Sequence, residues 1–243
     1  MKICLAQTRP ISGDISANTR KHLQFIKQAS QNNADLIAFS ELSLTGYEPE
    51  LAESFALELY NKKLDVFQKE SDNLHMILCI GVPLKVKRGI AISMIIFQPY
   101  SPRIVYSKKY LHPDEEPYFV SGESTLQIIG TNPKIAPAIC YEISIEDHEH
   151  FAMQRAPDIY LASVAKFESG IAPSYKRLSQ LAGHNDVFAL MVNAVGPADN
   201  GLCVGQSAVW NEDGKMLDCL DSKKEGILIL DTKEPSVFRK DID

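Results

Sequence analysis

Three reactive side chains each follow an apolar, strand-like run at the point where a polar turn begins. They are Glu41, Lys108 and Cys140, and the preceding runs are residues 35–40, 103–107 and 134–139. In α/β folds the strand ends form the crevice where ligands bind, so residues distant in sequence can meet there. A carboxylate base, a cation and a thiol are the groups that nucleophilic catalysis by cysteine requires.

Cysteine alone is weak evidence for catalysis, because a cysteine in an apolar run is usually a core residue. We assign that structural role to four cysteines, Cys4, Cys79, Cys203 and Cys219. Cys140 differs, because Tyr141-Glu142 and a predicted helix follow it. This strand-to-helix elbow is expected to expose the sulfur beside a backbone N–H.

The acid has a competing structural explanation. Glu41 stands in an otherwise apolar segment, residues 37–46, where an unpaired carboxylate costs several kcal/mol. Lys108 is a candidate partner for it. From residue types alone, a stabilising ion pair without chemistry and a catalytic pair remain equally good interpretations.

The elements that position these residues alternate short strands with a few helices. Hydrophobic periodicity predicts helices over residues 17–31, 51–71, 145–155 and 174–185. Strands are expected at the N-terminus and over residues 36–39, 75–82, 89–98, 103–107, 126–129, 135–139, 159–164, 188–193 and 226–231, with two more flanking the turn at residues 211–214.

Strands outnumber helices, and several strands are apolar along their whole length. This pattern suggests two β-sheets facing one another with helices outside, a four-layer α-β-β-α sandwich, because both faces of each sheet are then covered. A single doubly wound sheet would give similar local signals and stays open. We find no linker, so residues 1–243 are expected to form one domain.

Composition excludes several classes of function. The net charge of −6 gives no electrostatic reason to expect nucleic acid or an anionic membrane as partner. Neither a signal peptide nor a run of about 18 apolar residues is present. Five scattered cysteines without metal-type spacing are consistent with reduced thiols, so we expect a cytoplasmic protein without a metal.

The residues around the three reactive positions resemble the nitrilase, or carbon-nitrogen hydrolase, superfamily. Phe39-Ser-Glu-Leu-Ser-Leu-Thr-Gly-Tyr47 is similar to the family's glutamate motif, Val105-Tyr-Ser-Lys-Lys-Tyr-Leu111 to its lysine motif, and Ala138-Ile-Cys-Tyr-Glu142 to its nucleophile motif. Glutamate stands in the last of these where aspartate is common. Residues 115–122, 193–196 and 205–214 extend the resemblance over nearly the whole chain.

The resemblance implies a mechanism without metal or organic cofactor. Cys140 would attack an amide or related carbon, with Glu41 as the base that later protonates the leaving nitrogen. Lys108 and the backbone N–H of Tyr141 would stabilise the oxyanion. Glu115 is implied as a second glutamate that orients the lysine, and water activated by Glu41 would then hydrolyse the thioester.

At two positions of the predicted site, adjacent residues offer the same kind of side chain. Lys108 and Lys109 point to opposite faces of an extended segment, and the motif selects Lys108. Counting back from Gly122 favours Glu115 over Glu116, and Asp114 after a proline is assigned to a turn.

Four further residues are expected to contact substrate or oxyanion, namely Tyr47, Tyr141, Lys166 and Phe167. For Lys166 a contact with a substrate carboxylate and a solvated lysine remain open. His148 and His150 are two residues apart on a predicted helix, so we interpret them as surface residues and not as metal ligands. His184 departs from the glutamate common at its position in relatives.

Several functions therefore remain open. An amidase that releases ammonia from a small carboxamide is favoured, because tyrosine follows the cysteine. A nitrilase or N-carbamoyl-amide hydrolase would use the same residues, and a non-catalytic binding protein would keep only the fold. Residues 115–122 also resemble glutaminase domains that supply a synthetase, and with that function this protein would need a partner that consumes the ammonia. By resemblance, we also expect a homodimer or a larger homo-oligomer.

Overall fold

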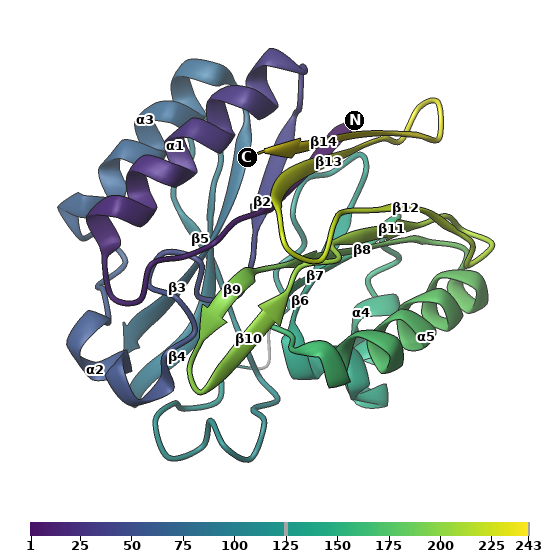
Figure 1. The fold of residues 1–243 in the computed structure, drawn as a ribbon. Helices are drawn as coiled ribbons and strands as arrows, with labels where there is room; N and C mark the ends of the chain where they lie inside the picture. The colour runs from purple at the N-terminus through teal and green to yellow at the C-terminus, as the bar shows by residue number, and fades with distance from the viewer. Residues whose placement is uncertain (124–125, 243) are drawn as a thin grey trace.

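The protein folds as a four-layer α-β-β-α sandwich, as expected from the strand pattern (Figure 1). The computed structural model describes residues 1–123 and 126–242. Figure 1 shows α1 and α3 on one outer side, α4 and α5 on the other, and two sheets between them. Among the described residues, none of the helices has the length and hydropathy needed to cross a membrane.

The larger sheet has the strand order β14-β13-β1-β2-β3-β4-β5. Its strands are β1 (Lys2–Gln7), β2 (Leu36–Phe39), β3 (Ile77–Val86), β4 (Gly89–Phe97), β5 (Ile104–Ser107), β13 (Glu225–Asp231) and β14 (Ser236–Ile242). Strands β1, β2 and β3 are parallel, and the remaining pairings are antiparallel.

The smaller sheet has the order β12-β11-β8-β7-β6, with β6, β7 and β8 parallel. Its strands are β6 (Ile135–Ile139), β7 (Ile159–Val164), β8 (Phe188–Asn193), β11 (Ala208–Trp210) and β12 (Met216–Cys219). A separate hairpin pairs β9 (Val195–Ala198) with β10 (Gly201–Val204).

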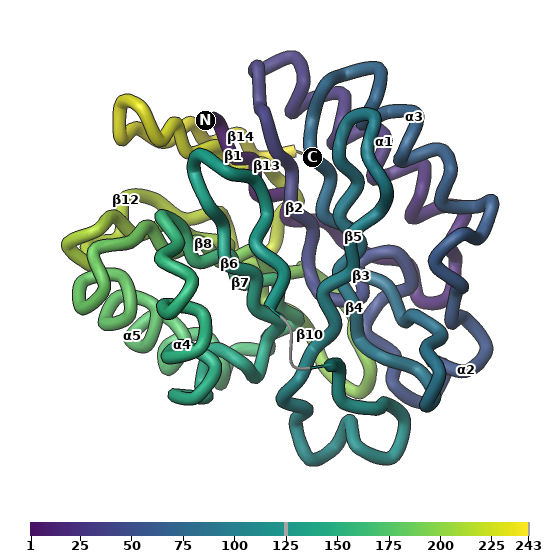
Figure 2. The backbone as a smooth tube through the Cα atoms, turned by 180° about the vertical axis from the view of Figure 1, so that it is seen from behind, coloured from purple at the N-terminus to yellow at the C-terminus, as the bar shows by residue number. Residues whose placement is uncertain are grey.

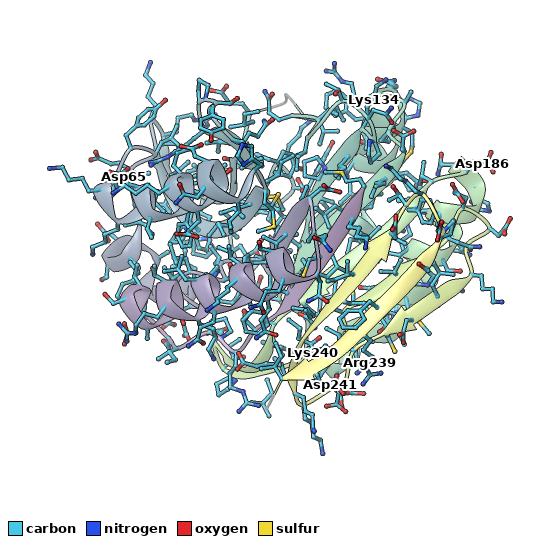
Figure 3. The ribbon with its side chains drawn as sticks, turned by 90° about the horizontal axis from the view of Figure 1, so that it is seen from above. Asp65, Lys134, Asp186, Arg239, Lys240 and Asp241 are labelled. Atoms are coloured by element: carbon cyan, nitrogen blue, oxygen red, sulfur yellow. The ribbon has the colours of Figure 1, made fainter. Side chains whose placement is uncertain are left out.

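Helices α1 (Ile15–Gln31) and α3 (Asp65–Leu74) cover the larger sheet, and α4 (Glu146–Met153) and α5 (Glu168–Asn185) cover the smaller one. Figure 3 views the layers from above, with Asp65 at the start of α3 on one outer side and Asp186, directly after α5, on the other. The side chain of Asp14 caps α1 by accepting the N–H of Ala17 at 2.9 Å.

Strand β1 explains why both faces of a sheet strand are apolar here. Ile3 and Leu5 belong to the core between the sheets, whereas Cys4 and Ala6 belong to the core under α1 and α3. Side chains alternate across a strand, so a sheet covered on both faces needs apolar residues at every position. The whole-length apolar strands therefore follow from the four-layer arrangement.

Three predicted elements differ from the structure, and three strands were not predicted. The helix expected over residues 51–71 is interrupted: α2 (Ala52–Phe55) ends early and α3 begins at Asp65. Between them, Leu57 pairs with the β3 backbone, donating its N–H to Pro83 O at 3.0 Å and accepting from Lys85 N at 2.8 Å. These bonds to a neighbouring strand require an extended backbone, which ends the helix.

Residues 126–129 do not form a strand, because Ile129 makes only an isolated bridge to Ile135. The helix expected from residue 174 already begins at Glu168 and contains Pro173. Strand β14 and the β9–β10 hairpin were not predicted. Their sequences lack an apolar alternation because β14 is an exposed edge strand and the hairpin carries Gly and Pro.

Candidate active site

The three reactive residues lie at the carboxyl ends of strands in both sheets. Glu41 follows β2 and Lys108 follows β5 of the larger sheet, whereas Cys140 follows β6 of the smaller sheet. The Ser163 hydroxyl donates to Phe39 O at 2.9 Å and so joins the end of β7 to the end of β2. Figure 2 shows β2 to β5 beside β6 and β7, with these strands approaching one another across the sandwich.

Lys108 lies at the centre of a buried ion triad. Its Nζ donates to Glu41 Oε1 at 2.8 Å and to Glu115 Oε1 at 2.7 Å. The side chains of Lys108 and Glu41 are fully buried, and that of Glu115 is 1% exposed. The three groups are removed from water, and in such surroundings charges interact more strongly than at the surface.

Burial raises the pKa of Glu41 to about 7; Lys108 acts in the opposite direction and Glu115 adds to the rise. For Lys108, burial alone lowers the pKa, but Glu41, Cys140 and Glu115 outweigh it and hold the pKa above its usual value. The lysine is therefore a permanent cation, and Glu41 changes charge near neutral pH.

Cys140 occupies a strained elbow at the start of a short 3₁₀ turn, Cys140–Ser144. Its φ of 45° lies in the left-handed region, which costs a non-glycine residue about 1 to 3 kcal/mol. Burial and then Glu41 raise the pKa of the half-buried thiol to about 11, whereas Lys166 and Lys108 act to lower it. At neutral pH the sulfur is a thiol that needs a base.

The second carboxylate oxygen of Glu41 is available for that task. Glu41 Oε2 is buried and has no hydrogen-bond partner among the described residues. The Cys140 thiol also lowers the pKa of Glu41. A buried acceptor without a donor is costly, so this oxygen is suited to accept a proton from a nearby group.

Glu115 is fixed from both sides, which the sequence did not reveal. Its Oε1 accepts the Tyr47 hydroxyl at 3.0 Å, and its Oε2 accepts the backbone N–H of His112 at 2.8 Å. Glu116 and Asp114 are exposed. The structure therefore brings Glu115, and neither neighbouring carboxylate, to Lys108.

Two glycines allow the site segments to approach other backbone closely. A Cβ on Gly81 of β3 would lie 2.4 Å from Ser40 O, the carbonyl before Glu41. A Cβ on Gly122 would lie 2.3 Å from Ser107 O, the carbonyl before the lysine. Only glycine permits these approaches, so larger residues would displace the acid or the lysine segment.

Glu142 links the lysine segment to the cysteine segment, and sequence reasoning missed this role. Its Oε1 accepts the N–H of Lys109 at 2.7 Å, and its Oε2 accepts the N–H of Ile139 at 2.8 Å and the hydroxyl of Tyr106 at 2.6 Å. The residues after Lys108 and before Cys140 are thereby held by one buried carboxylate. Its place in the nucleophile motif was the only sequence signal.

His148 contradicts the prediction of a surface residue. It is 2% exposed, with Nε2 2.9 Å from the Tyr106 hydroxyl and Nδ1 3.0 Å from the Tyr160 hydroxyl. Burial lowers the pKa of His148, while Glu142 acts to raise it. The face of α4 that carries His148 packs against the sheet, whereas His150 is exposed as expected. Within residues 1–123 and 126–242, no group of three His, Cys, Asp or Glu side chains could hold a metal ion.

The remaining predicted site residues lie around this centre. Tyr141 is half-buried and its ring meets that of His112 edge-on at 5.1 Å. Phe167 and Tyr47 pack against the same small cluster around Cys203, and Lys166, which precedes Phe167, is half-buried. His184 is exposed on α5. Of the four cysteines assigned to the core, Cys219 is half-buried and the other three are buried.

The sequence matches the family model described as carbon-nitrogen hydrolase over residues 2–237. It is 28% identical over 234 residues to the glutamine-dependent NAD(+) synthetase of Acinetobacter baylyi. The matched region covers 92% of this chain but only 42% of that protein. It is 23% identical over 247 residues to an (R)-stereoselective amidase of Pseudomonas sp., covering 100% of this chain and 89% of that enzyme. The chain thus spans less than half the length of the synthetase.

Among solved structures, the amidase of Nesterenkonia sp. AN1 superposes with a TM-score of 0.84 at 21% identity. The superposition covers 96% of this chain and 93% of that one. At this identity the likeness establishes the fold, which agrees with the layers and sheets described above. Because the family model extends over nearly the whole sequence and the motif resemblance is thereby confirmed, the chain belongs to the carbon-nitrogen hydrolase family of the nitrilase superfamily.

Proposed function

We propose that this protein hydrolyses a small carboxamide to a carboxylic acid and ammonia through a thioester on Cys140. The observation that carries the proposal is the buried Glu41, bonded to Lys108 at 2.8 Å through one oxygen and unpartnered at the other within the described part of the chain. A base with a pKa of about 7 beside a thiol with a pKa of about 11 suits proton transfer during attack.

In the first half-reaction the Cys140 sulfur forms a bond to the amide carbon, and its proton passes to Glu41 Oε2. The carbonyl oxygen becomes an oxyanion that Lys108 and the N–H of Tyr141 stabilise, a contribution of about 3 to 4 kcal/mol for one donor. When the C–N bond breaks, Glu41 returns the proton to the nitrogen. Ammonia leaves and the acyl group stays on sulfur.

In the second half-reaction Glu41, again ionised, takes a proton from water, whose oxygen attacks the thioester carbon. As the C–S bond breaks, Glu41 returns this proton to the sulfur, which restores the Cys140 thiol, and the carboxylic acid departs. Glu115 takes no proton in this scheme. It holds the lysine ammonium at 2.7 Å and is itself held by Tyr47 and His112.

Two similar proteins support an amide as the substrate, whereas another relative, from Schizosaccharomyces pombe, is named as a probable nitrilase. One relative is named as an (R)-stereoselective amidase. A mutant structure of the Nesterenkonia sp. AN1 amidase is described as showing covalent addition of the acetamide moiety of fluoroacetamide at the active-site cysteine. The present chain has a cysteine on a strained elbow beside a base, which is consistent with the same chemistry.

A second candidate is a glutaminase that supplies ammonia to a synthetase. The observation that favours it is the similarity to glutamine-dependent NAD(+) synthetases, of which the chain spans 42% and 41% in two species. Glutamine carries a terminal carboxamide, so the same site would serve. This function requires a partner that consumes ammonia.

A screen of ammonia release over ω-amides, N-carbamoyl amino acids and nitriles tests the proposal. Cys140→Ala is expected to abolish turnover without unfolding, and Cys203→Ala, which removes a neighbouring buried thiol, is the matched control. Mass analysis during turnover is expected to find an acyl adduct on the peptide that contains Cys140. An adduct on another cysteine, or unchanged turnover by Cys140→Ala, would refute the assigned nucleophile.

A further inference from the structure

Lys166 stands at the same strand-end edge as the candidate nucleophile. Strand β6 runs parallel to β7, with Ile139 paired to Ser163, so the chain leaves both strands side by side. Cys140 directly follows β6, and Lys166 follows β7 after Ala165. The two residues are therefore brought together by sheet register rather than by sequence proximity.

The backbone of Lys166 is fixed by its neighbours. Its N–H donates to Asn193 Oδ1 at 2.8 Å, and its carbonyl accepts from Asn193 Nδ2 at 3.1 Å and from Val204 N at 3.2 Å. Asn193 is fully buried and also donates to Gly205 O at 2.7 Å. The lysine thus starts from a rigid position at the end of the sheet.

The stem of the Lys166 side chain has a defined position, but its ammonium has no partner in the described part of the chain. Its Cβ, Cγ and Cδ atoms each lie 3.6 Å from the position that a Cβ on Gly170 would take, so the stem follows the first turn of α5. Across residues 1–123 and 126–242, no carboxylate lies within 4.0 Å of its ammonium and no side-chain hydrogen bond engages it. The side chain is half-buried. A half-buried cation without a partner favours an anion that arrives from outside.

Two observations connect this ammonium to the site. Lys166 acts to lower the pKa of Cys140, against the larger effect of burial. The next residue, Phe167, packs in the same cluster as Tyr47, whose hydroxyl bonds to Glu115. By contrast, Lys108 is already shared by two carboxylates. Of these two lysines that act on the Cys140 thiol, Lys166 is the one without a carboxylate partner in the described part of the chain, and so it can bind a charged substrate group.

We propose that Lys166 binds a carboxylate at the end of the substrate opposite the amide, so that the preferred substrates are ω-carboxamides of short carboxylic acids. This inference rests on the proposed amide hydrolysis. A single ammonium matches the single charge of a carboxylate, and a charge-assisted hydrogen bond between the two is stronger than one between neutral groups. Lys166 would act as a residue of specificity, not of bond breaking.

The first experiment compares succinamate, which carries a carboxylate, with butanamide, its uncharged counterpart. In Lys166→Gln the ratio of kcat/KM for succinamate to that for butanamide is expected to fall at least about tenfold. Lys176→Gln, which removes an exposed lysine of α5, is expected to leave the ratio unchanged. An equal fall for both amides would mean that Lys166 acts only on the thiol and would overturn the proposal.

A second experiment does not depend on hydrolysis. N-(Iodoacetyl)glycine and N-(iodoacetyl)glycinamide differ in one charge, and both form a C–S bond with Cys140 while iodide leaves and the thiol proton passes to Glu41. The wild type is expected to react faster with the carboxylate reagent, and Lys166→Gln is expected to lose that preference. Equal rates in the wild type would overturn the role of Lys166 even if neither amide is a substrate.

Discussion

The Lys108 ammonium lies 2.8 Å from Glu41 Oε1 in a fully buried pair whose members are 67 residues apart in sequence. Lys108 also contacts Glu115, so the site contains one more negative than positive group when both acids are ionised. Burial raises the pKa of Glu41 and Glu115 adds to the rise, while the shared ammonium determines the expected behaviour of substitutions in the triad.

Lys108→Met is expected to destabilise the fold and to lower the activity strongly. Two buried carboxylates would lose their shared cation, and breaking such a pair typically costs about 3 to 5 kcal/mol. The loss of an oxyanion donor is expected to lower kcat by about 10²- to 10³-fold. Urea denaturation and ammonia release measure the two effects.

Lys109→Met is the matched control, because the Lys109 ammonium lies over the rings of Tyr110 and Phe151 and contacts neither acid. It is expected to keep most of its activity. If Lys109→Met abolished turnover while Lys108→Met did not, the assignment of the two lysines would be reversed.

Glu41→Gln is expected to remove activity but to stabilise the protein above neutral pH. The pKa of Glu41 is about 7 in the folded state against an ordinary value of 4.5. Its contribution to stability is therefore fully present below pH 4.5 and is lost as pH rises through 7. Glutamine has no charge and avoids this loss.

The difference in melting temperature between Glu41→Gln and the wild type should consequently grow from pH 5 to pH 8. Differential scanning calorimetry at several pH values measures it. A difference that stays constant with pH would show that Glu41 titrates below this window.

The pH dependence of wild-type kcat/KM is expected to follow the base. Glu41 must be ionised to accept the thiol proton, so the rate should rise with pH and level off above about 7. The thiol, with a pKa of about 11, stays protonated over this range and adds no second rise. An acid limb centred near 4.5, the ordinary value for glutamate, would contradict the raised pKa.

Glu142→Gln is expected to lower kcat with little change in KM. The carboxylate accepts backbone N–H groups on both the lysine and the cysteine segments, and an amide NH₂ would face one of these donors. The stability loss is expected to be about 1 to 3 kcal/mol. Steady-state kinetics and urea denaturation are the measurements.

Glu142→Asp should recover part of the activity, because it keeps the charge. Glu149→Gln on α4 is the control: that residue accepts from Asn185 at 2.8 Å and pairs with Arg177, away from the lysine segment. If Glu149→Gln lowered kcat as strongly as Glu142→Gln, a general loss of stability would explain both.

Much of the fold could be predicted because its strands are marked locally. Residues 36–39, 135–139, 159–164 and 188–193 are short apolar runs bounded by polar turns, and each is a strand with those bounds. The prediction of one helix over residues 51–71 was wrong because Leu57 forms backbone hydrogen bonds to β3. Local periodicity gives no information about such a long-range contact. The edge strand β14 was not predicted because its side chains are mostly exposed and its sequence has no apolar alternation.

By itself, the sequence predicted Glu41, Lys108 and Cys140 as candidate catalytic residues, and it determined their position at strand ends and, through the flanking motifs, the family. The tertiary structure decided which carboxylate reaches Lys108, since Glu115 is buried while Glu116 is exposed. It also revealed Glu142 as the link between the lysine and cysteine segments. These outcomes depend on distances and burial between residues far apart in the chain, and such quantities exist only once the two sheets have packed together.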